Sequence, residues 1–319
     1  MNIEEVPLKL CLVKSAARAL VASGIFAMAP VVPVMAPVIA LTTGCGVGFA
    51  STGRHAHVKE AVRPSADELA AEQRLLTQPF ALAVPEDAIV RVVGPSMTCT
   101  GTVIEDDLIL TAHHCLVERG AHGEFSKKLL EPSSIKIELG GDYFAWGEVS
   151  TRAIIAPPCG EGGGAGDLAV IVLSRKLVGL STMTPRLEAP PKIGEEVNPV
   201  GFGRCALSPD GIRRKERTGG AIRALTGETM HLDASVCPGD SGGPVFAKGS
   251  REIVGVVSLS AMDHDEHTRG ASIMARIDAY RLVFAHARLI ADGIASNELP
   301  PLECVAPDAR TDAKPEKKK

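Results

Sequence analysis

The chain has 319 residues, including 22 Pro and 32 Gly but only 3% aromatic residues, and this composition suits a loop-rich β domain better than a helical bundle. Its formal net charge of -4 gives no overall basic field, so neither nucleic acid nor a membrane surface is favoured as a partner. The 8 cysteines include no CxxC pair and no Cys/His cluster at zinc spacing, which favours disulfides in an oxidising compartment over a metal site. We therefore expect an exported monomer of one sizeable domain with appendages and without a metal or other cofactor.

Residues 1–45 resemble a signal segment, because basic residues precede an uncharged stretch from Ala19 to Cys45. A retained membrane anchor is the alternative, although prolines within the stretch would disturb a helix. Residues 41–45 resemble a bacterial lipoprotein processing site, with Thr42 at the position where Leu is usual. Lipidation of Cys45 and plain export with trimming both fit this segment. The expected location is secreted or the cell envelope, and membrane attachment requires the lipid or a retained signal.

Residues 46–80 are expected to form a linker or a short pro-region, and residues 81–298 the folded domain. From Ala88 onward, short β-branched runs are separated by turn residues, a pattern typical of an antiparallel sandwich or barrel. The runs are Ala88–Gly94, Gly101–Ile104, Leu108–Thr111, Ser134–Leu139, Leu168–Leu173, Glu196–Gly201, Thr229–Leu232, Pro244–Phe246 and Ile253–Ser258. The segment Ile277–Ile294 has apolar residues spaced for one face of a helix. Residues 299–319 are predicted to form a flexible charged tail.

Three segments carry the groups that nucleophilic catalysis by serine requires, namely a base, a group that orients the base, and donors for the oxyanion. In Cys237–Pro244 the glycines let the backbone turn tightly, so that the amides of Gly239 and Ser241 can point into one cavity with Ser241 at its rim. Leu110–Cys115 ends a predicted strand and places an imidazole beside a cysteine. In Gly166–Leu173 an acid opens an apolar strand, a position that suits an orienting carboxylate at the edge of the core.

The motifs TAHHC, DLAV and GDSGGP in these segments resemble TAAHC, DIAL and GDSGGP, which mark the trypsin and chymotrypsin superfamily in the same order. The resemblance covers roughly Ala88 to Ile294. It implies an all-β fold of two six-stranded antiparallel barrels with the active site between them, to which the last periodic segment adds a C-terminal helix. It also implies an exported serine endopeptidase that hydrolyses protein or peptide substrates through an acyl-enzyme intermediate.

The family's catalytic histidine directly precedes a cysteine, so the resemblance assigns that role to His114 and leaves His113 as a structural or exposed residue. It implies that Ser241 attacks the scissile carbonyl, that His114 takes and returns the proton, and that Asp167 fixes the tautomer of the histidine. The amides of Gly239 and Ser241 would then form the oxyanion hole.

The resemblance also pairs Cys99 with Cys115, a bridge that pins the loop of the base and is worth about 3 kcal/mol in the chain-entropy model. For the remaining cysteines of the domain we expect Cys205 to pair with Cys237 and Cys159 with Cys304. The sequence alone permits other connectivities.

The substrate pocket implied by the family lacks an acidic group. Ser235 occupies the position six before the nucleophile, which is Asp in trypsin-like members, so we predict a pocket for small or apolar residues and a weak preference for Arg or Lys. Ser258 stands where the family has a serine that often hydrogen-bonds the triad aspartate, and Ser260 replaces a common Gly and could narrow the pocket. Asp233 would reach the pocket only through an unusual loop.

Asp240 is the residue that, in animal members of the family, pairs with a new N-terminus of the form IVGG. No such sequence occurs upstream, so we expect the domain to mature without that insertion. Asp240 then needs another partner, because an unpaired buried carboxylate is unfavourable, and the sequence does not identify it. The basic residues between Arg204 and Arg217 are expected to lie on an exposed hairpin or loop.

Three other interpretations fit parts of the sequence. A catalytically inactive, protease-like binding module would keep the fold, but every group that the triad needs is present. An esterase is disfavoured because the Gly-x-Ser-x-Gly elbow is absent around Ser241. A metal site at His264, Asp265, Glu266 and His267 is disfavoured because adjacent residues cannot all face one ion, and a solvated loop is expected there.

Overall fold

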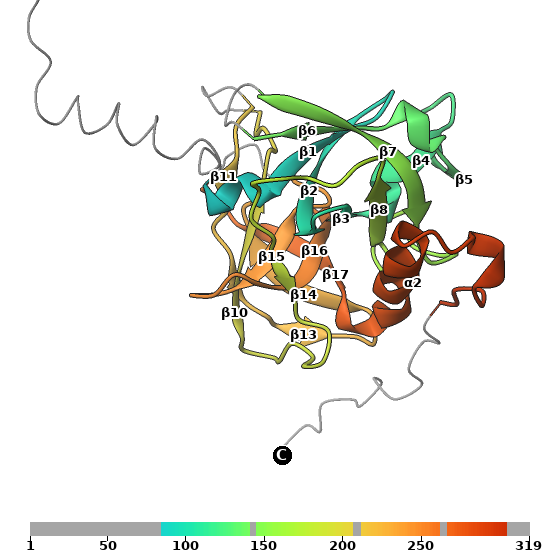
Figure 1. Ribbon diagram of the computed structural model, residues 1–319. Coiled ribbons are helices and arrows are strands. Elements are labelled where there is room, and N and C mark those ends of the chain that lie inside the picture. The colour runs from blue at the N-terminus through green and yellow to red at the C-terminus, as the bar shows by residue number, and fades with distance from the viewer. Residues whose placement is uncertain (1–83, 141–144, 207–211, 262–266, 305–319) are drawn as a thin grey trace, which may run out of the picture. The chain divides into compact units, whose positions relative to one another are not determined.

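The computed structural model describes residues 84–140, 145–206, 212–261 and 267–304. They form a closed barrel, a larger sheet, a short hairpin and a helix near the C-terminus, α2 (Arg281–Ala291) (Figure 1). The barrel strands are β1 (Ile89–Val93), β2 (Thr98–Glu105), β3 (Leu108–Thr111), β6 (Lys136–Leu139), β7 (Gly147–Ile155) and β8 (Ala169–Leu173). The larger sheet contains β9 (Thr184–Pro185), β10 (Glu196–Gly201), β11 (Lys215–Glu216), β12 (Gly220–Ala221), β13 (Ala224–Leu225), β14 (Thr229–Ala234), β15 (Pro244–Ala247), β16 (Glu252–Ser260) and β17 (Gly270–Arg276). The hairpin consists of β4 (Val117–Arg119) and β5 (Phe125–Leu129), and single 3-10 turns cover Pro85–Ala88, His113–Leu116, Pro132–Ser134, Asp278–Tyr280 and Ser296–Glu298.

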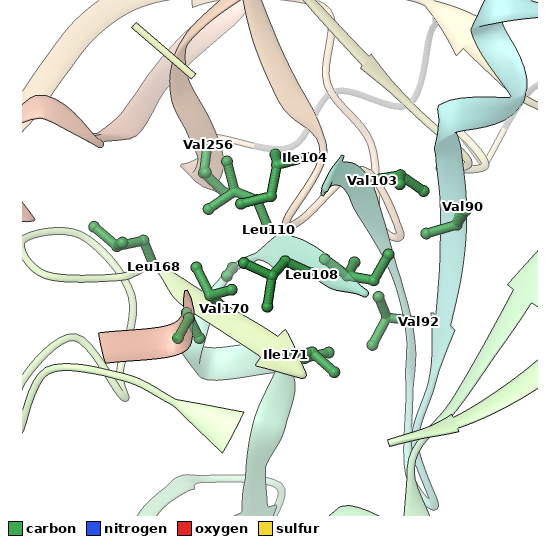
Figure 2. Packing of buried hydrophobic residues seen from close by; sticks show 14 of the residues in the cluster. Val90, Val92, Val103, Ile104, Leu108, Leu110, Leu168, Val170, Ile171 and Val256 are labelled. Carbon is green, nitrogen blue, oxygen red and sulfur yellow. The ribbon is translucent and has the colours of Figure 1, made fainter. Parts of the chain in front are cut away.

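The barrel closes because β1 pairs with both β2 and β6, giving the strand order β1-β2-β3-β8-β7-β6. Aliphatic side chains from these strands form its core, and Figure 2 shows part of it, including Val92, Leu108 and Ile171. Val256 of β16 belongs to the same cluster, so the core continues from the barrel into the larger sheet. Every residue of β8 is buried, and α2 packs beside this strand. The strand that follows Asp167 is therefore held firmly in place.

The larger sheet runs in the order β11-β10-β15-β16-β17-β14-β13, with β12 added to β10 and β9 to β16. Apart from the short parallel pairing of β9 with β16, its ladders are antiparallel. The segment between β11 and β12 also contacts the residue that follows β14, because the N–H of Ser235 donates to the carbonyl of Thr218 at 2.9 Å. The prediction of an all-β fold with a C-terminal helix is confirmed. The second half contains more strands than predicted, because β17 and the two-residue strands β9, β11, β12 and β13 are additional.

The C-terminal helix is shorter than the predicted segment Ile277–Ile294. A 3-10 turn at Asp278–Tyr280 leads into α2, and Gly293, with a φ of 102°, lies just beyond its end. Glycine adopts this left-handed conformation without a steric penalty, which is why helices commonly stop there. The predicted apolar face packs on the barrel through residues that include Val283, Phe284 and Ala287.

Three disulfides stabilise the described residues, and they are the pairs expected from the sequence: Cys99–Cys115, Cys159–Cys304 and Cys205–Cys237. The second of them ties residues 299–304 to the segment between β7 and β8, and Leu302 packs against the barrel core. This part of the predicted flexible tail is therefore ordered, because a covalent bond and an apolar contact hold it. The predicted signal segment at 1–45, the linker at 46–80 and the rest of the tail lie outside the described residues. Among the described helices, none has the length and apolar character needed to cross a membrane.

Candidate active site

His114 lies on the 3-10 turn that follows β3, and Asp167 lies two residues before β8, so the pairing of β3 with β8 brings the two residues together. His114 Nδ1 and Asp167 Oδ2 are 2.7 Å apart, and the backbone N–H of His114 donates to Asp167 Oδ1 at 2.9 Å. The two residues are only 3% and 0% exposed. One buried carboxylate thus holds both the ring and the backbone of this histidine.

Ser258 of β16 adds another donor to the same carboxylate. Its hydroxyl donates to Asp167 Oδ2 at 2.5 Å and accepts from the N–H of Gly164 at 2.7 Å. Because an ionised carboxylate only accepts hydrogen bonds, Nδ1 of a neutral His114 must carry the ring proton. The other ring nitrogen, Nε2, is then left with a lone pair, as a general base requires.

Ser241 lies on a tight loop between β14 and β15. Its carbonyl accepts from the N–H of Thr100 at 2.8 Å, and the N–H of the next residue, Gly242, donates to the carbonyl of Val257 at 2.8 Å. Gly242 has a φ of 82°, and a Cβ at this position would lie 2.3 Å from the carbonyl oxygen of Thr100, so no other residue fits without a shift. Val257 directly precedes Ser258. The loop that carries Ser241 is therefore anchored to the same strand as the histidine network.

The N–H groups of Gly239 and Ser241 donate no hydrogen bond within the described residues. Gly239 has a φ of 100°, and its carbonyl accepts from Thr100 Oγ1 at 2.7 Å, which fixes the orientation of the following peptide group. Ser241 Oγ likewise makes no hydrogen bond to a described residue, and His114 Nε2 lies 3.7 Å from the sulfur of Cys115. Two amides and one hydroxyl at this loop are thus available to a ligand, and the structure contains no hydrogen bond between Ser241 and His114.

Asp240 pairs with Arg217, the partner that the sequence does not identify. Arg217 Nε is 2.8 Å from Asp240 Oδ2 and Nη2 is 3.1 Å from Oδ1, and the N–H groups of Gly203 and Cys237 donate to the same carboxylate at 2.7 and 2.8 Å. Burial raises the pKa of Asp240, and Arg217 and the two amides act in the opposite direction. Arg217 is 3% exposed, so the prediction that this basic segment is an exposed loop is wrong at this residue. The physical reason is that a fully buried carboxylate needs a cation beside it.

His113 is buried, and its Nδ1 lies 2.8 Å from the carbonyl oxygen of Cys159. Because a carbonyl only accepts, this nitrogen carries the proton. Burial lowers the pKa of His113, which favours the neutral ring. His113 therefore supports the loop that leads to Asp167.

The structure gives one group of side chains with metal-ligand spacing among the described residues, namely Cys99, His114 and Cys115. The two sulfurs are joined in a disulfide and cannot act as thiolate ligands, so this group does not fit a metal ion. In the other suggested cluster, His264, Asp265 and Glu266 lie outside the described residues.

The serines predicted to line the substrate pocket lie in the larger sheet and near it. Ser235 is 1% exposed, and its hydroxyl accepts from a backbone amide at 3.0 Å. Ser260 lies opposite Ser272 in the β16–β17 ladder, and their hydroxyl oxygens are 3.0 Å apart. Asp233 forms an ion pair with Arg223. These residues supply small hydroxyl groups, and the nearby carboxylate already has a cationic partner.

Three residues of this region are not singled out as site residues by the sequence: Arg217, Ser272 and Phe125. Arg217 belongs to the basic segment 204–217. The need of Asp240 for a cation could have pointed to this segment, but not to the individual arginine. Ser272 and the ring of Phe125, which lies 5.3 Å from the His114 ring in an edge-to-face arrangement, are placed by strand pairing that the local pattern does not reveal.

Comparison with known proteins agrees with the motifs. The family model for trypsin matches residues 83–283, a range that includes His114, Asp167 and Ser241. Among solved structures, the chain is similar to mouse neuropsin, a serine protease expressed in the limbic system of the brain. The TM-score is 0.47 and the identity 17%, over 65% of this chain and 97% of that chain. No curated protein matches the chain.

Proposed function

This chain belongs to the trypsin family, and from that premise we propose that it is an exported serine endopeptidase with a triad of Ser241, His114 and Asp167. The observation that carries the proposal is the buried carboxylate of Asp167, which bonds both the ring and the backbone of His114. In a neutral imidazole, this arrangement fixes the tautomer that has its lone pair at Nε2, the form in which histidine accepts a proton from serine.

In the proposed reaction, Ser241 Oγ attacks the carbonyl carbon of the scissile bond while His114 Nε2 takes the hydroxyl proton. The proton then passes from Nε2 to the leaving amine, the C–N bond breaks, and an acyl group remains on Ser241. Water attacks this ester with His114 again as the base, which releases the acid and restores the serine. The N–H groups of Gly239 and Ser241, which have no other acceptor in the described structure, would bind the oxyanion of each tetrahedral intermediate.

The ion pair between Asp240 and Arg217 supports maturation without an inserted N-terminus. Both side chains are buried, and the carboxylate also accepts two backbone N–H groups. The cation that an inserted N-terminal ammonium would supply is thus already present within the domain. We therefore expect activity that does not depend on proteolytic cleavage to IVGG.

The residue before the scissile bond is proposed to be small and uncharged. Ser260 and Ser272 bond to each other across β16 and β17, and neither Ser235 nor this pair offers a negative charge to Arg or Lys. Rates on peptides with Ala, Leu, Phe, Arg or Glu at that position test this, with Ala expected to be fastest. Replacing both Ser260 and Ser272 by Gly should shift the preference toward larger residues. A dominant rate with Arg in the unmodified protein would contradict the assignment.

The disulfide bonds of the domain support export. Three disulfides cross-link the described residues, and such bonds persist in oxidising compartments. The signal segment proposed at 1–45 and the two processing routes at Cys45 are tested by determining the mature N-terminus and its lipid content by mass spectrometry.

The decisive test of the enzymatic proposal is labelling with a fluorophosphonate probe, which reacts with activated serines. Wild type is expected to be labelled, whereas Ser241→Ala and His114→Ala should remain unlabelled and fail to hydrolyse peptides. The inactive binding module is the second candidate, favoured by the absence of a hydrogen bond between Ser241 and His114 in the structure. A correctly folded wild type that is neither labelled nor active would establish that alternative.

A further inference from the structure

The hairpin β4–β5 follows directly on the turn that carries His114, and one of its side chains, Phe125, lies against the histidine ring while a second, Arg119, stacks on Phe125. The ring centroids of Phe125 and His114 are 5.3 Å apart, with the ring planes 79° from parallel. The guanidinium carbon of Arg119 lies 3.6 Å from the centroid of the same Phe125 ring. At this distance, cation–π attraction and stacking hold the guanidinium in a fixed position close to the proposed base.

Arg119 has only neutral partners among the described residues. Its Nη1 donates to the carbonyl of Gly123 at 3.0 Å, and its Nη2 contacts the Met97 sulfur at 3.1 Å. Other arginines of the domain, such as Arg91 and Arg217, pair with carboxylates. Burial lowers the pKa of Arg119, and no carboxylate acts against it. Since a guanidinium has five N–H groups in a planar fork, Arg119 keeps donors for an external carboxylate.

The position of Arg119 indicates which half of a peptide it would meet. Met97, which it contacts, is two residues before Cys99, and the disulfide partner of Cys99, Cys115, has its sulfur 3.7 Å from His114 Nε2. Ser258 of β16 instead lies on the opposite side of the His114 ring, because its hydroxyl bonds Asp167 Oδ2, the atom that contacts His114 Nδ1. Ser260, which is proposed to line the pocket for the residue before the scissile bond, also lies in β16, so the acyl half of the substrate is expected beside this strand. Arg119 therefore stands where the leaving-group half would lie.

We propose that Arg119 is a specificity-determining residue that binds a substrate carboxylate at one of the first two residues after the scissile bond. The inference rests on the proposed endopeptidase function. Phe125 has a positioning role, because its ring holds the guanidinium beside His114. The carboxylate can belong to an Asp or Glu side chain or to the free end of a short product segment, and both present the same planar pair of oxygens to the guanidinium fork.

The test uses fluorogenic peptides that differ only after the scissile bond. One pair carries Asp or Asn with an amidated end, and a second pair ends in a free carboxylate or an amide at the same position. Wild type is expected to cleave the charged member about 10-fold faster in kcat/KM, in line with one charge-assisted hydrogen bond. Arg119→Met should abolish this ratio, Arg119→Lys should keep part of it, and Arg175→Met, which changes an exposed arginine, should leave it unchanged.

An ester substrate with no residue after the scissile bond separates the two proposals. Wild type and Arg119→Met should hydrolyse it at similar rates. A wild type that hydrolyses the ester and the peptides but does not distinguish charged from neutral members overturns the carboxylate site alone. A loss of ester hydrolysis in Arg119→Met would also overturn it, because Arg119 would then only support His114. A wild type inactive on every substrate overturns the endopeptidase function itself.

Discussion

Two buried carboxylates, Asp167 and Asp240, organise the two halves of the domain in different ways. Both are 0% exposed, and both accept hydrogen bonds from backbone N–H groups. Asp167, at the start of a barrel strand, has the imidazole of His114 as its main side-chain partner, whereas Asp240, on the loop before β15, has the guanidinium of Arg217. The two carboxylates are equally buried, but their side-chain partners differ.

The difference lies in what each partner does with a proton. Arginine stays charged at any pH at which the domain is folded, so the Asp240–Arg217 pair can only hold the loop of Ser241 in place. Histidine changes charge near neutral pH, so the Asp167–His114 pair can accept a proton and release it within one reaction cycle. Under the proposed mechanism, Asp240 stabilises the loop of Ser241 and Asp167 takes part in the reaction, so substitutions at the two sites should separate rate from stability.

The largest expected effect is on rate, at Asp167. In Asp167→Asn an amide replaces the carboxylate. If the NH₂ group of the amide faces Nδ1, the ring proton moves to Nε2, which is the wrong tautomer for a base. The imidazolium also loses its counter-charge. We expect kcat to fall by about 10⁴-fold. Hydrolysis of a peptide and of an ester substrate measures this, with circular dichroism to show that the variant is folded. A variant that keeps near-wild-type kcat would exclude Asp167 from the triad.

The next effect is on stability, at Arg217. Arg217→Met leaves the carboxylate of Asp240 buried without its cation, which should lower the free energy of unfolding by about 3–5 kcal/mol. Urea unfolding followed by fluorescence measures the loss. Arg204→Met is the matched control, because Arg204 is exposed in the same basic segment and its removal should change little.

A double variant keeps this prediction testable if Arg217→Met does not fold. Adding Asp240→Asn removes the uncompensated charge, so the double variant should regain most of the lost stability. If the double variant is no more stable than Arg217→Met, the ion pair is not what makes Arg217 important.

Ser258 allows a finer test at the Asp167 centre. Ser258→Ala removes one donor to the carboxylate but leaves both bonds from His114, so we expect kcat to fall by about 10-fold, far less than in Asp167→Asn. Ser134→Ala serves as a control, because its hydroxyl lies on an exposed turn and bonds only the carbonyl of Glu131. Equal losses for Ser258→Ala and Asp167→Asn would mean that the serine, rather than the carboxylate alone, fixes the histidine.

The two centres also differ in how far the sequence predicts them. His114 and Asp167 each lie in a short motif beside an apolar strand. The cysteine after His114 identifies it, rather than His113, as the candidate base. The partner of Asp240 lies 23 residues away, in a segment whose charges alone indicate exposure, and only the folded chain brings it to the carboxylate. Long-range ion pairs of this kind leave no local pattern.

The same limit applies to strands. Five of the six barrel strands follow from β-branched runs such as that of β8, whereas β7 (Gly147–Ile155) is not among the predicted runs. By contrast, β17 consists of Gly-Ala-Ser-Ile-Met-Ala-Arg, with a single β-branched residue, and its conformation depends on ladders to β14 and β16 on both sides. Tertiary pairing here outweighs intrinsic propensity. Ser272, opposite Ser260, could not be assigned to the pocket without that pairing.

The smallest expected effect is the pH dependence that His113, next to His114, gives to stability. Burial lowers the pKa of His113 below its ordinary value of 6.5, so as the pH falls the unfolded chain binds this proton before the folded chain does. The stability that the neutral ring contributes is therefore present above pH 6.5 and is lost as the pH falls toward the folded-state pKa, by at most about 1.4 kcal/mol per pH unit. His113→Asn retains a donor for the Cys159 carbonyl without titrating. Urea unfolding between neutral and mildly acidic pH should show a shallower decline for this variant, whereas Arg204→Met, which changes an exposed arginine, should keep the wild-type slope. Identical slopes for wild type and His113→Asn would place the acid sensitivity elsewhere.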